Sequence, residues 1–373
     1  MVAFDTTSLT PNLDLVTHVT DTFEGQASDV VVQPCDDGTR ANVFARFGPA
    51  APDGVVLSAH TDVVPVAGQD WDSDPFEVVE DGTRLVGRGT TDMKGFIACL
   101  LAAVPRLADA DLGVPVWIAL SHDEEIGALG AAPLAAAMAA LPHPPTRVVV
   151  GEPTSMGIVN AHKSVRGHVA TFRGLGGHSS QPDGGANALR ALVLLGTFID
   201  GLAREERAIT DERFDPSFTT FNLAMASAGT ALNIIPDHAE LVFEYRALPQ
   251  RDGPELAARI EAHGRDVLLP QLQATAPEAS FEFGTTGILP ALRADTTAAA
   301  AALVRDVLGI DDPGTTAPFG TDAARFQDAG MSAVVCGPGD IAIAHRPNEF
   351  IERDQLAACA DFLDHLVDHL TTS

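Results

Sequence analysis

The stretch Val55-Val56-Leu57-Ser58-Ala59-His60-Thr61-Asp62 decides how the rest of the chain is interpreted. It begins with a short apolar run, as expected for a strand buried within a sheet. A histidine and an aspartate follow at its end, so we expect their side chains at the edge of that sheet, within reach of a metal ion or a substrate. A His-x-Asp pair alone more often marks a surface turn, and the remainder of the chain decides between the two interpretations.

Similar apolar runs recur along the first 165 residues and alternate with helical patterns. The apolar runs are Val30–Val32, Val116–Leu120 and Val148–Val150, and the helical patterns are Leu13–Phe23, Asp92–Leu107 and Gly127–Ala140. This alternation is typical of an α/β sheet covered by helices. The pattern resumes after about Ile288, where the sequence predicts helices at Thr296–Leu308, Thr321–Ala329 and Arg353–Leu370 and a strand at Ala333–Cys336.

The segment between these two parts has a different order of elements. The sequence predicts strands at Val165–Arg173, Thr219–Ala226, Ala239–Ala247 and Phe281–Phe283, with helices at Asn187–Arg204 and Pro254–Leu268. This β-α-β-β-α-β order is typical of a ferredoxin-like domain. We therefore predict one discontinuous α/β domain of residues 1–165 and 288–373, interrupted by an inserted α+β domain of residues 166–287.

Composition excludes several classes of partner and location. A chain of 373 residues is long enough for about two domains. Its formal net charge of −28 argues against a nucleic-acid partner and against an anionic membrane surface. The four cysteines lie far apart without Cys-x-x-Cys spacing, and neither a secretory signal nor a bilayer-length apolar run is present. These features predict a cytoplasmic location.

Four later segments supply ligand-type side chains that match His60. They contribute Asp92, the adjacent pair Glu124 and Glu125, Glu152 and His345. Imidazole nitrogens and carboxylate oxygens without thiolates suit Zn²⁺, or a neighbouring ion such as Co²⁺ or Mn²⁺. If one acid of the adjacent pair binds metal, the set has two imidazoles and three carboxylates, which exceed what one catalytic zinc uses and suit two ions bridged by one carboxylate. Each residue alone could be a helix cap, a turn residue or a solvated acid, but several of them follow apolar strands, where α/β sheets place their sites.

The adjacent acids Glu124 and Glu125 predict a division of roles. One carboxylate can bind a metal ion while the other faces a water molecule, takes its proton and later delivers that proton to a leaving nitrogen. Asp62, two residues after His60, is expected to orient the His60 ring rather than to bind metal.

Seven motifs carry a resemblance to a known family. They are Ser-Ala-His-Thr-Asp-Val-Val-Pro (58–65), Gly-Arg-Gly-Thr-Thr-Asp-Met-Lys-Gly-Phe (87–96), Ser-His-Asp-Glu-Glu-Ile-Gly (121–127), Gly-Glu-Pro-Thr-Ser-Met (151–156), Ala-His-Lys (161–163), Gly-Gly-His-Ser-Ser (176–180) and Ala-His-Arg-Pro-Asn-Glu-Phe (344–350). With them the chain resembles the M20 metallopeptidase family over nearly its whole length. The resemblance implies a zinc-peptidase-like catalytic domain, with a central mixed sheet flanked by helices, and an inserted lid domain that also forms a homodimer contact.

The resemblance also implies a role for each site residue. Asp92 would bridge two ions, of which one is also held by His60 and Glu152 and the other by Glu125 and His345. Glu124 would be the general base and acid. In the lid, His178 would stabilise the oxyanion, often in the partner's active site, although a histidine in a glycine-rich loop needs no such role. Asn233 and Arg246 would bind the substrate carboxylate, and for Arg246 a cross-strand pair with Glu240 or Glu244 is the structural alternative.

The implied reaction is hydrolysis of a small N-acyl amino acid, with N2-acetyl-L-ornithine as the first expectation. The alternatives are a desuccinylase acting on succinyl-diaminopimelate, an aminoacylase or a dipeptidase of the same architecture. A binding protein that kept the fold and lost its metal is the alternative outside enzymes.

Overall fold

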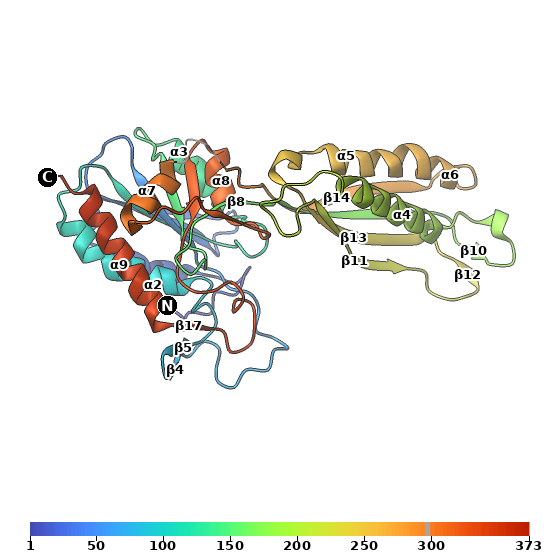
Figure 1. The fold of residues 1–373 in the computed structure, drawn as a ribbon. Coiled ribbons are helices and arrows are strands. Elements are labelled where there is room, and N and C mark those ends of the chain that lie inside the picture. Colours follow the sequence, from blue (N-terminus) through green and yellow to red (C-terminus); the bar gives the residue numbers. More distant parts are fainter. Residues whose placement is uncertain (295–298, 373) are drawn as a thin grey trace. The chain divides into compact units, whose positions relative to one another are not determined.

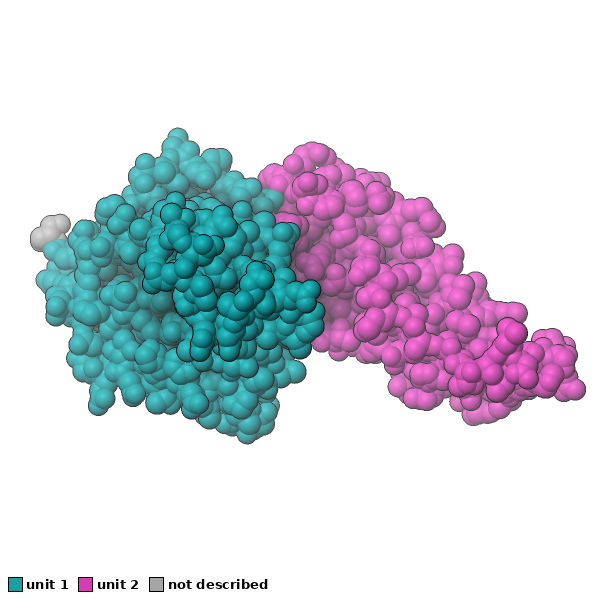
Figure 2. Space-filling model, turned by 90° about the horizontal axis from the view of Figure 1, so that it is seen from below, with its two compact units in different colours: residues 1–161, 292–316, 321–373 teal, residues 162–291, 317–320 magenta. Residues whose placement is uncertain are grey.

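The computed structural model of the chain describes residues 1–294 and 299–372, and the chain folds into two compact units (Figures 1 and 2). Unit 1 comprises Met1–Ala161, Leu292–Thr316 and Thr321–Ser373, and unit 2 comprises His162–Ala291 and Ala317–Gly320. The sequence places the boundaries at 165/166 and 287/288, a few residues away on each side. The short segment 317–320, which the sequence assigns to the discontinuous domain, packs with unit 2.

Unit 1 is built on an eight-stranded mixed sheet, and the predicted α/β class is confirmed. The strand order is β1 (Asp29–Pro34), β2 (Ala41–Phe47), β6 (Val116–Ser121), β3 (Val55–His60), β7 (Arg147–Val150), β16 (Ser332–Val335), β8 (Val159–His162) and β15 (Thr315–Ala317). The four central strands β6, β3, β7 and β16 pair in parallel, whereas β2 joins β6 and β1 in antiparallel pairs. Strands β3 and β6 are buried along their whole length, which explains why their sequences are continuous apolar runs.

Helices flank this sheet. The main apolar cluster of unit 1 joins strand residues to α1 (Leu13–Phe23), α2 (Lys94–Asp109), α7 (Ala299–Leu308) and α9 (Arg353–Leu370), and α2 and α9 lie side by side in Figure 1. Two shorter helices, α3 (Ala131–Ala139) and α8 (Ala323–Asp328), pack against each other. The predicted bounds of α1 and α9 are confirmed, whereas residues 296–298 of the helix expected from Thr296 lie outside the described residues. No helix in the described part of the chain is both long and apolar enough to cross a bilayer.

A small three-stranded sheet of unit 1 was not predicted from the sequence. It consists of β17 (Phe350–Glu352), β5 (Arg84–Val86) and β4 (Val79–Asp81), paired in that order. Each of these strands is only three residues long, and Ile351 is the one buried residue among them, so they leave no apolar pattern in the sequence. Their pairing places Phe350 opposite Val86, which joins the His345–Phe350 segment to the turn that precedes Asp92.

Unit 2 has the predicted β-α-β-β-α-β order. Its antiparallel sheet runs β11 (Thr220–Ala228), β13 (His238–Arg246), β9 (Val165–Arg173) and β14 (Ser280–Leu289), the strand order of a ferredoxin-like domain. One apolar cluster joins this sheet to α4 (Ala188–Glu206), α5 (Glu255–Ala262), the π-helical turn η3 (His263–Leu268) and α6 (Leu269–Gln273). The minor elements are β10 (Gly177–His178), β12 (Ile234–Ile235), η1 (Pro182–Gly184) and η2 (Pro249–Arg251).

Alternation along β13 confirms one prediction in detail. Leu241, Phe243 and Tyr245 are buried, while the residues between them are partly exposed. The buried residues pack on α4 and α5 as one face of the sheet. The strand expected at Phe281–Phe283 is longer than predicted, because β14 pairs with β9 as far as Leu289.

His168 on β9 lies buried among aromatic rings. Its ring centroid is 5.0 Å from that of Phe283, 5.6 Å from that of Phe243 and 5.7 Å from that of Tyr245. Among the described residues its Nε2 atom has no hydrogen-bond partner. Burial lowers the pKa of His168 below its ordinary value, and nearby Arg166 lowers it further.

We predict that protonation of His168 destabilises unit 2. Because the pKa is lower in the folded than in the unfolded chain, the unfolded state binds the proton more readily. Stability is therefore complete above about pH 6.5, the ordinary histidine value, and is lost as the pH falls below it. The fall in thermal midpoint between pH 7.5 and pH 5.5, followed by circular dichroism, should be smaller for His168→Phe than for the unmodified chain. A His365→Phe variant, changed at an exposed site, should show the same fall in thermal midpoint as the unmodified chain. An equal fall in all three proteins would contradict the prediction.

Candidate metal centre

All five side chains predicted as metal ligands belong to unit 1 and lie near strand or helix ends. His60 ends β3, Glu125 follows β6, Glu152 follows β7, Asp92 precedes α2 and His345 precedes β17. Strands β3, β6 and β7 are parallel, so their carboxyl ends meet at one edge of the sheet. The continuous apolar runs that make these strands therefore also bring three of the ligands together.

Asp92 lies between the two histidines. Its Oδ1 atom is 3.0 Å from His60 Nε2, and its Oδ2 atom is 3.2 Å from His345 Nε2. Glu152 Oε1 lies 3.6 Å from His60 Nε2, and Glu125 Oε2 lies 3.0 Å from His345 Nε2. The five side chains thus form two groups that share Asp92. We call Asp92, His60 and Glu152 group A, and Asp92, Glu125 and His345 group B.

The charges of these side chains favour a bound cation. Burial raises the pKa of Glu152 well above its ordinary value and that of Glu125 to about 7, and the Asp92 carboxylate adds to both shifts. Hydrogen bonds to Asp92 and Glu125 raise the pKa of His345 to about 10. Buried carboxylates that repel one another need positive charge nearby, which protons on the histidines supply in this arrangement. Divalent cations supply it as well.

One oxygen atom of the centre points to a ligand directly. Glu125 Oε1 is buried and has no hydrogen-bond partner among the residues that the structure describes. Two sets of ligand atoms, from His60, Glu124 and Glu152 and from His60, Asp92 and Glu125, each lie within 4.8 Å of one another. Nitrogen and oxygen donors at this spacing suit Zn²⁺, Co²⁺ or Mn²⁺. The residues present therefore fit a pair of divalent ions.

Glu124 has the environment of a proton-transfer group. The residue as a whole is only partly buried, but burial of its carboxyl group raises its pKa well above the ordinary value, and the Glu152 carboxylate raises it further. A carboxyl group with a raised pKa is a stronger base than an ordinary glutamate, which suits a group that accepts and returns a proton.

Asp62 supports both the histidine and the acid pair. Its Oδ1 accepts a hydrogen bond from the Glu124 N–H (2.9 Å), and its Oδ2 accepts one from the Glu125 N–H (3.2 Å). His60 Nδ1 lies 2.9 Å from the Asp62 carbonyl oxygen and 3.5 Å from its carboxylate. The closer partner of the ring is thus the backbone of Asp62, while its carboxylate fixes the loop that carries Glu124 and Glu125, a contact that the sequence does not reveal.

Two further residues of the centre were missed from the sequence. Glu349 is buried, and its Oε1 accepts hydrogen bonds from the backbone N–H groups of Thr91 (2.9 Å) and Asp92 (3.0 Å). Asp322 is buried as well, accepts a hydrogen bond from Ser121 Oγ (2.6 Å), and has its pKa raised to about 6 by burial. Glu349 stands inside the 344–350 motif, which was the available signal, whereas Asp322 appears in the sequence only as the start of a helix. The peptide bond between Asp92 and Met93 is cis.

The predicted lid residues His178, Asn233 and Arg246 belong to unit 2. His178 on β10 is exposed and pairs with Ile234 on β12, next to Asn233, whose carbonyl accepts a hydrogen bond from the Ser179 N–H (3.1 Å). Arg246 ends β13, and its Nε donates to Glu244 Oε1 (3.3 Å); Glu244 is one of the partners expected from the sequence, but it lies on the same strand rather than across the sheet. The structure therefore brings His178 and Asn233 together, and gives Arg246 a partner of its own.

Comparisons with known proteins agree with this arrangement. The family model of peptidase family M20/M25/M40 matches residues 56–369. Acetylornithine deacetylase of Myxococcus xanthus is 32% identical over 382 residues, which cover 99% of this chain and 95% of that relative. The fold is similar to that of Sso-CP2, an M20 family metallo-carboxypeptidase of Sulfolobus solfataricus, with a TM-score of 0.73, 18% identity, and 98% and 97% of the two chains covered. Bacillus subtilis YXEP, a dinuclear metal binding peptidase of the M20 family, matches with a TM-score of 0.63 and 18% identity over 99% and 96% of the chains.

Proposed function

The chain belongs to peptidase family M20/M25/M40, and we propose that it is a cytoplasmic deacetylase that converts N2-acetyl-L-ornithine to L-ornithine and acetate. As a member of this family it is a hydrolase of amide bonds. The observation that carries the proposal is the pair of ligand groups that share Asp92, with the Glu124 carboxyl group beside them. The choice of N2-acetyl-L-ornithine as substrate is supported by the acetylornithine deacetylase that is 32% identical over nearly the whole chain.

In the proposed hydrolysis, the metal ions and the side chains have different roles. Two divalent ions held by groups A and B, with Zn²⁺ as the first expectation and Co²⁺ as the alternative, would polarise the amide carbonyl and make a water molecule acidic. Glu124 would take the proton of the attacking water and deliver it to the leaving nitrogen of ornithine. Asp62 keeps the Glu124 and Glu125 backbone in place for this transfer through its two hydrogen bonds. His178 would donate to the oxyanion, and Asn233 and Arg246 would hold the substrate carboxylate.

Replacement of Glu124 tests the proton-transfer role. Glu124→Gln keeps the shape of the side chain but cannot accept a proton, so we expect kcat to fall by about 10²–10⁴-fold. Metal content, measured by atomic emission, should stay at the level of the unmodified chain, because Glu124 is not one of the five ligands. Glu77→Gln, at an exposed site, is the matched control and should retain full activity. Near-native turnover of Glu124→Gln with its metal bound would refute the assignment.

A substrate panel tests the acyl group and the amino acid. We expect the highest kcat/KM for N2-acetyl-L-ornithine when the enzyme is supplied with Zn²⁺ and then with Co²⁺. The panel should also contain N-succinyl-diaminopimelate, simple N-acetyl amino acids and a dipeptide. A higher kcat/KM for any of these would replace the deacetylase assignment by that of a desuccinylase, an aminoacylase or a dipeptidase, while leaving the hydrolase class intact.

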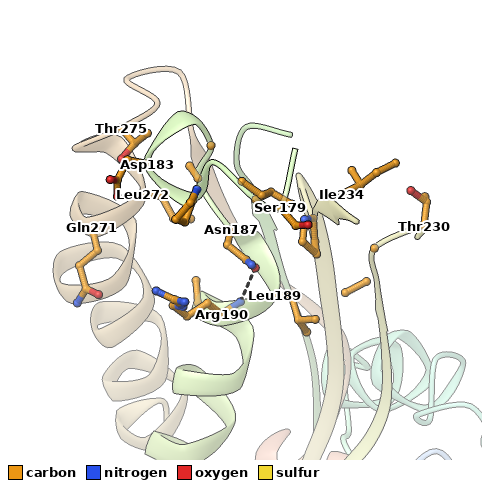
Figure 3. Close-up of a pocket in the computed structure, with 18 of the residues that line it drawn as sticks. Ser179, Asp183, Asn187, Leu189, Arg190, Thr230, Ile234, Gln271, Leu272 and Thr275 are labelled. Carbon is orange, nitrogen blue, oxygen red and sulfur yellow. Dashed lines mark hydrogen bonds between the residues drawn. The ribbon is translucent and has the colours of Figure 1, made fainter. Parts of the chain in front are cut away.

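Unit 2 exposes an apolar surface that suits a second copy of the chain. Its exposed apolar side chains are Leu189, Val193 and Leu194 on α4, Leu223 and Met225 on β11, and Leu232 and Ile234 around the β12 turn. They lie on adjacent elements, since α4 packs against β11, and β11 ends its sheet with no further strand paired to it among the described residues. A neighbouring cavity of about 740 Å³ is lined by Leu189, Ile234 and Leu272 together with polar groups, and these three residues are labelled in Figure 3. We propose that this surface forms a homodimer through edge pairing of β11 and burial of these side chains.

A charge on this surface tests the dimer. Met225 is 65% exposed, so Met225→Glu costs the monomer little and would place an unpaired carboxylate in the proposed interface. We expect Met225→Glu to be monomeric by light scattering at concentrations where the unmodified chain is dimeric. Ile310→Glu, an equivalent change at an exposed site of unit 1, should remain dimeric. A monomeric unmodified chain, or a dimeric Met225→Glu, would contradict the proposal.

A further inference from the structure

His345 differs from the other four ligands in exposure and in backbone conformation. Its side chain is 52% exposed, whereas the Asp92 and Glu125 side chains of the same group are 6% and 7% exposed. His345 and Asn348 both have left-handed backbone conformations, with φ values of 65° and 57°. Such a conformation is costly for a residue with a Cβ atom and persists only where neighbours hold it. The position of this ligand therefore depends on what fastens the segment 345–349.

The loop of residues 69–72 provides that fastening, and we call it the brace. Gln69 Nε2 donates to the carbonyl oxygen of His345 (3.1 Å). Asp72 and Asn348 form a reciprocal pair, in which Asn348 Nδ2 donates to Asp72 Oδ2 (2.8 Å) and the Asp72 N–H donates to Asn348 Oδ1 (2.9 Å). The brace thus contacts both residues of the segment that have positive φ values.

Arg88 joins the brace to a second ligand. This side chain is 1% exposed, its Nη2 donates to Gln69 Oε1 (2.6 Å), and its Nη1 donates to Glu349 Oε2 (2.7 Å). Glu349 in turn accepts the backbone N–H of Asp92, as described above. Trp71 also donates to Gln69 Oε1 (3.1 Å), and its ring lies 5.1 Å from the Arg88 guanidinium carbon. One buried cation is therefore linked through Gln69 to His345 and through Glu349 to Asp92.

The network supports the two ligand groups unequally. His345 belongs to group B alone, whereas Asp92 belongs to both groups. In group A, His60 is held instead by Asp62, and Glu152 follows directly from β7. Within residues 1–294 and 299–372, neither Gln69 nor Arg88 forms a hydrogen bond with His60 or Glu152. A change in the brace should therefore move one ligand group more than the other.

We propose that Gln69, which accepts a hydrogen bond from Arg88, is a positioning residue that sets the affinity of the ion in group B separately from that of the ion in group A. This inference rests on the two-ion centre of the proposed function. Hydrogen-bonded partners behind metal ligands typically contribute about 10–100-fold to metal affinity, because they fix the ligand in its binding orientation. Gln69 acts on the single ligand that is exposed and conformationally costly, so its loss falls on group B.

Two variants of Gln69 separate its contacts, and a third variant elsewhere serves as the control. Gln69→Leu removes both the donated and the accepted hydrogen bonds at similar size. Gln69→Glu keeps an acceptor for Arg88 and Trp71 but cannot donate to the His345 carbonyl. Gln327→Leu is the matched control, because Gln327 is also partly buried in unit 1 and exchanges hydrogen bonds with the Arg293 backbone at 2.8 and 2.9 Å.

The readout is the binding of Zn²⁺ to metal-free protein, titrated against a chromophoric chelator, with Co²⁺ absorption spectra as a second measure. We expect the unmodified chain and Gln327→Leu to bind two ions per chain. Gln69→Leu and Gln69→Glu should keep the tighter ion and bind the other about 10–100-fold more weakly. Circular dichroism melting confirms that each variant is folded at the titration temperature.

Several results would overturn the inference. Unchanged binding of both ions by Gln69→Leu overturns it and leaves the proposed function standing, as does an equal weakening of both ions. If Gln69→Glu binds both ions as tightly as the unmodified chain, the hydrogen bond from Gln69 to the His345 carbonyl does not set the affinity, and the inference is overturned. Fewer than two ions bound by the unmodified chain at saturating Zn²⁺ overturns this inference together with the two-ion centre itself.

Discussion

Several buried carboxylates lie at one edge of the sheet of unit 1 and repel one another, and the structure of this unit depends on the positive charge that offsets their repulsion. Asp92, Glu124, Glu125 and Glu152 converge there with only two histidines among them, and burial raises the pKa of each of the three glutamates. Such a cluster is unfavourable by itself, because buried like charges repel and lose their hydration. It persists because parallel strands fix the positions of the acids and because positive charge can enter between them. The same repulsion that opposes folding therefore creates a strong preference for divalent cations.

Two other buried carboxylates near the centre, Asp62 and Glu349, are stabilised by backbone N–H groups, and Glu349 also by an arginine. Asp62 and Glu349 each accept two backbone N–H hydrogen bonds, from the residues 124–125 and 91–92 that carry the reacting side chains. These two carboxylates do not compete for metal, because their oxygens are already occupied. Their partners differ: Ser8 donates to Asp62 (2.7 Å), whereas buried Arg88 donates to Glu349. Both carboxylates are buried; Asp62 also lies 3.5 Å from His60 Nδ1, whereas Glu349 has the Arg88 guanidinium as its buried counter-charge.

The sequence predicts those parts of the molecule that have a periodic or motif signal. Helices α1 and α9 were predicted to the residue, and alternation along β13 identified its buried face, because each pattern repeats over several turns or residues. The five proposed ligands could be recognised because they follow apolar strands or stand in motifs, and the structure places them close together. Gln69 and Asp322 could not, and Glu349 was marked only by its place in the 344–350 motif, since a buried carboxylate or amide looks like a surface residue until its long-range partner is known. The partners of Glu349 lie more than 250 positions away along the chain.

Among the residues that the structure describes, the chain has no lysine at its surface that could bind an anionic group of a substrate. Its two lysines are both buried: Lys94 Nζ donates to the Phe4 carbonyl (2.6 Å), and Lys163 Nζ donates to the carbonyls of Pro216 and Phe218 (2.6 Å each). Burial lowers the pKa of both, that of Lys94 to about 8. Neither ammonium group is therefore available at the surface, so a charged partner for a substrate carboxylate has to be an arginine, a protonated histidine or a metal ion. Arginine offers two parallel donors to a carboxylate, so Arg246 is a chemically suitable choice, and its weak 3.3 Å contact with Glu244 is one that a substrate carboxylate could displace.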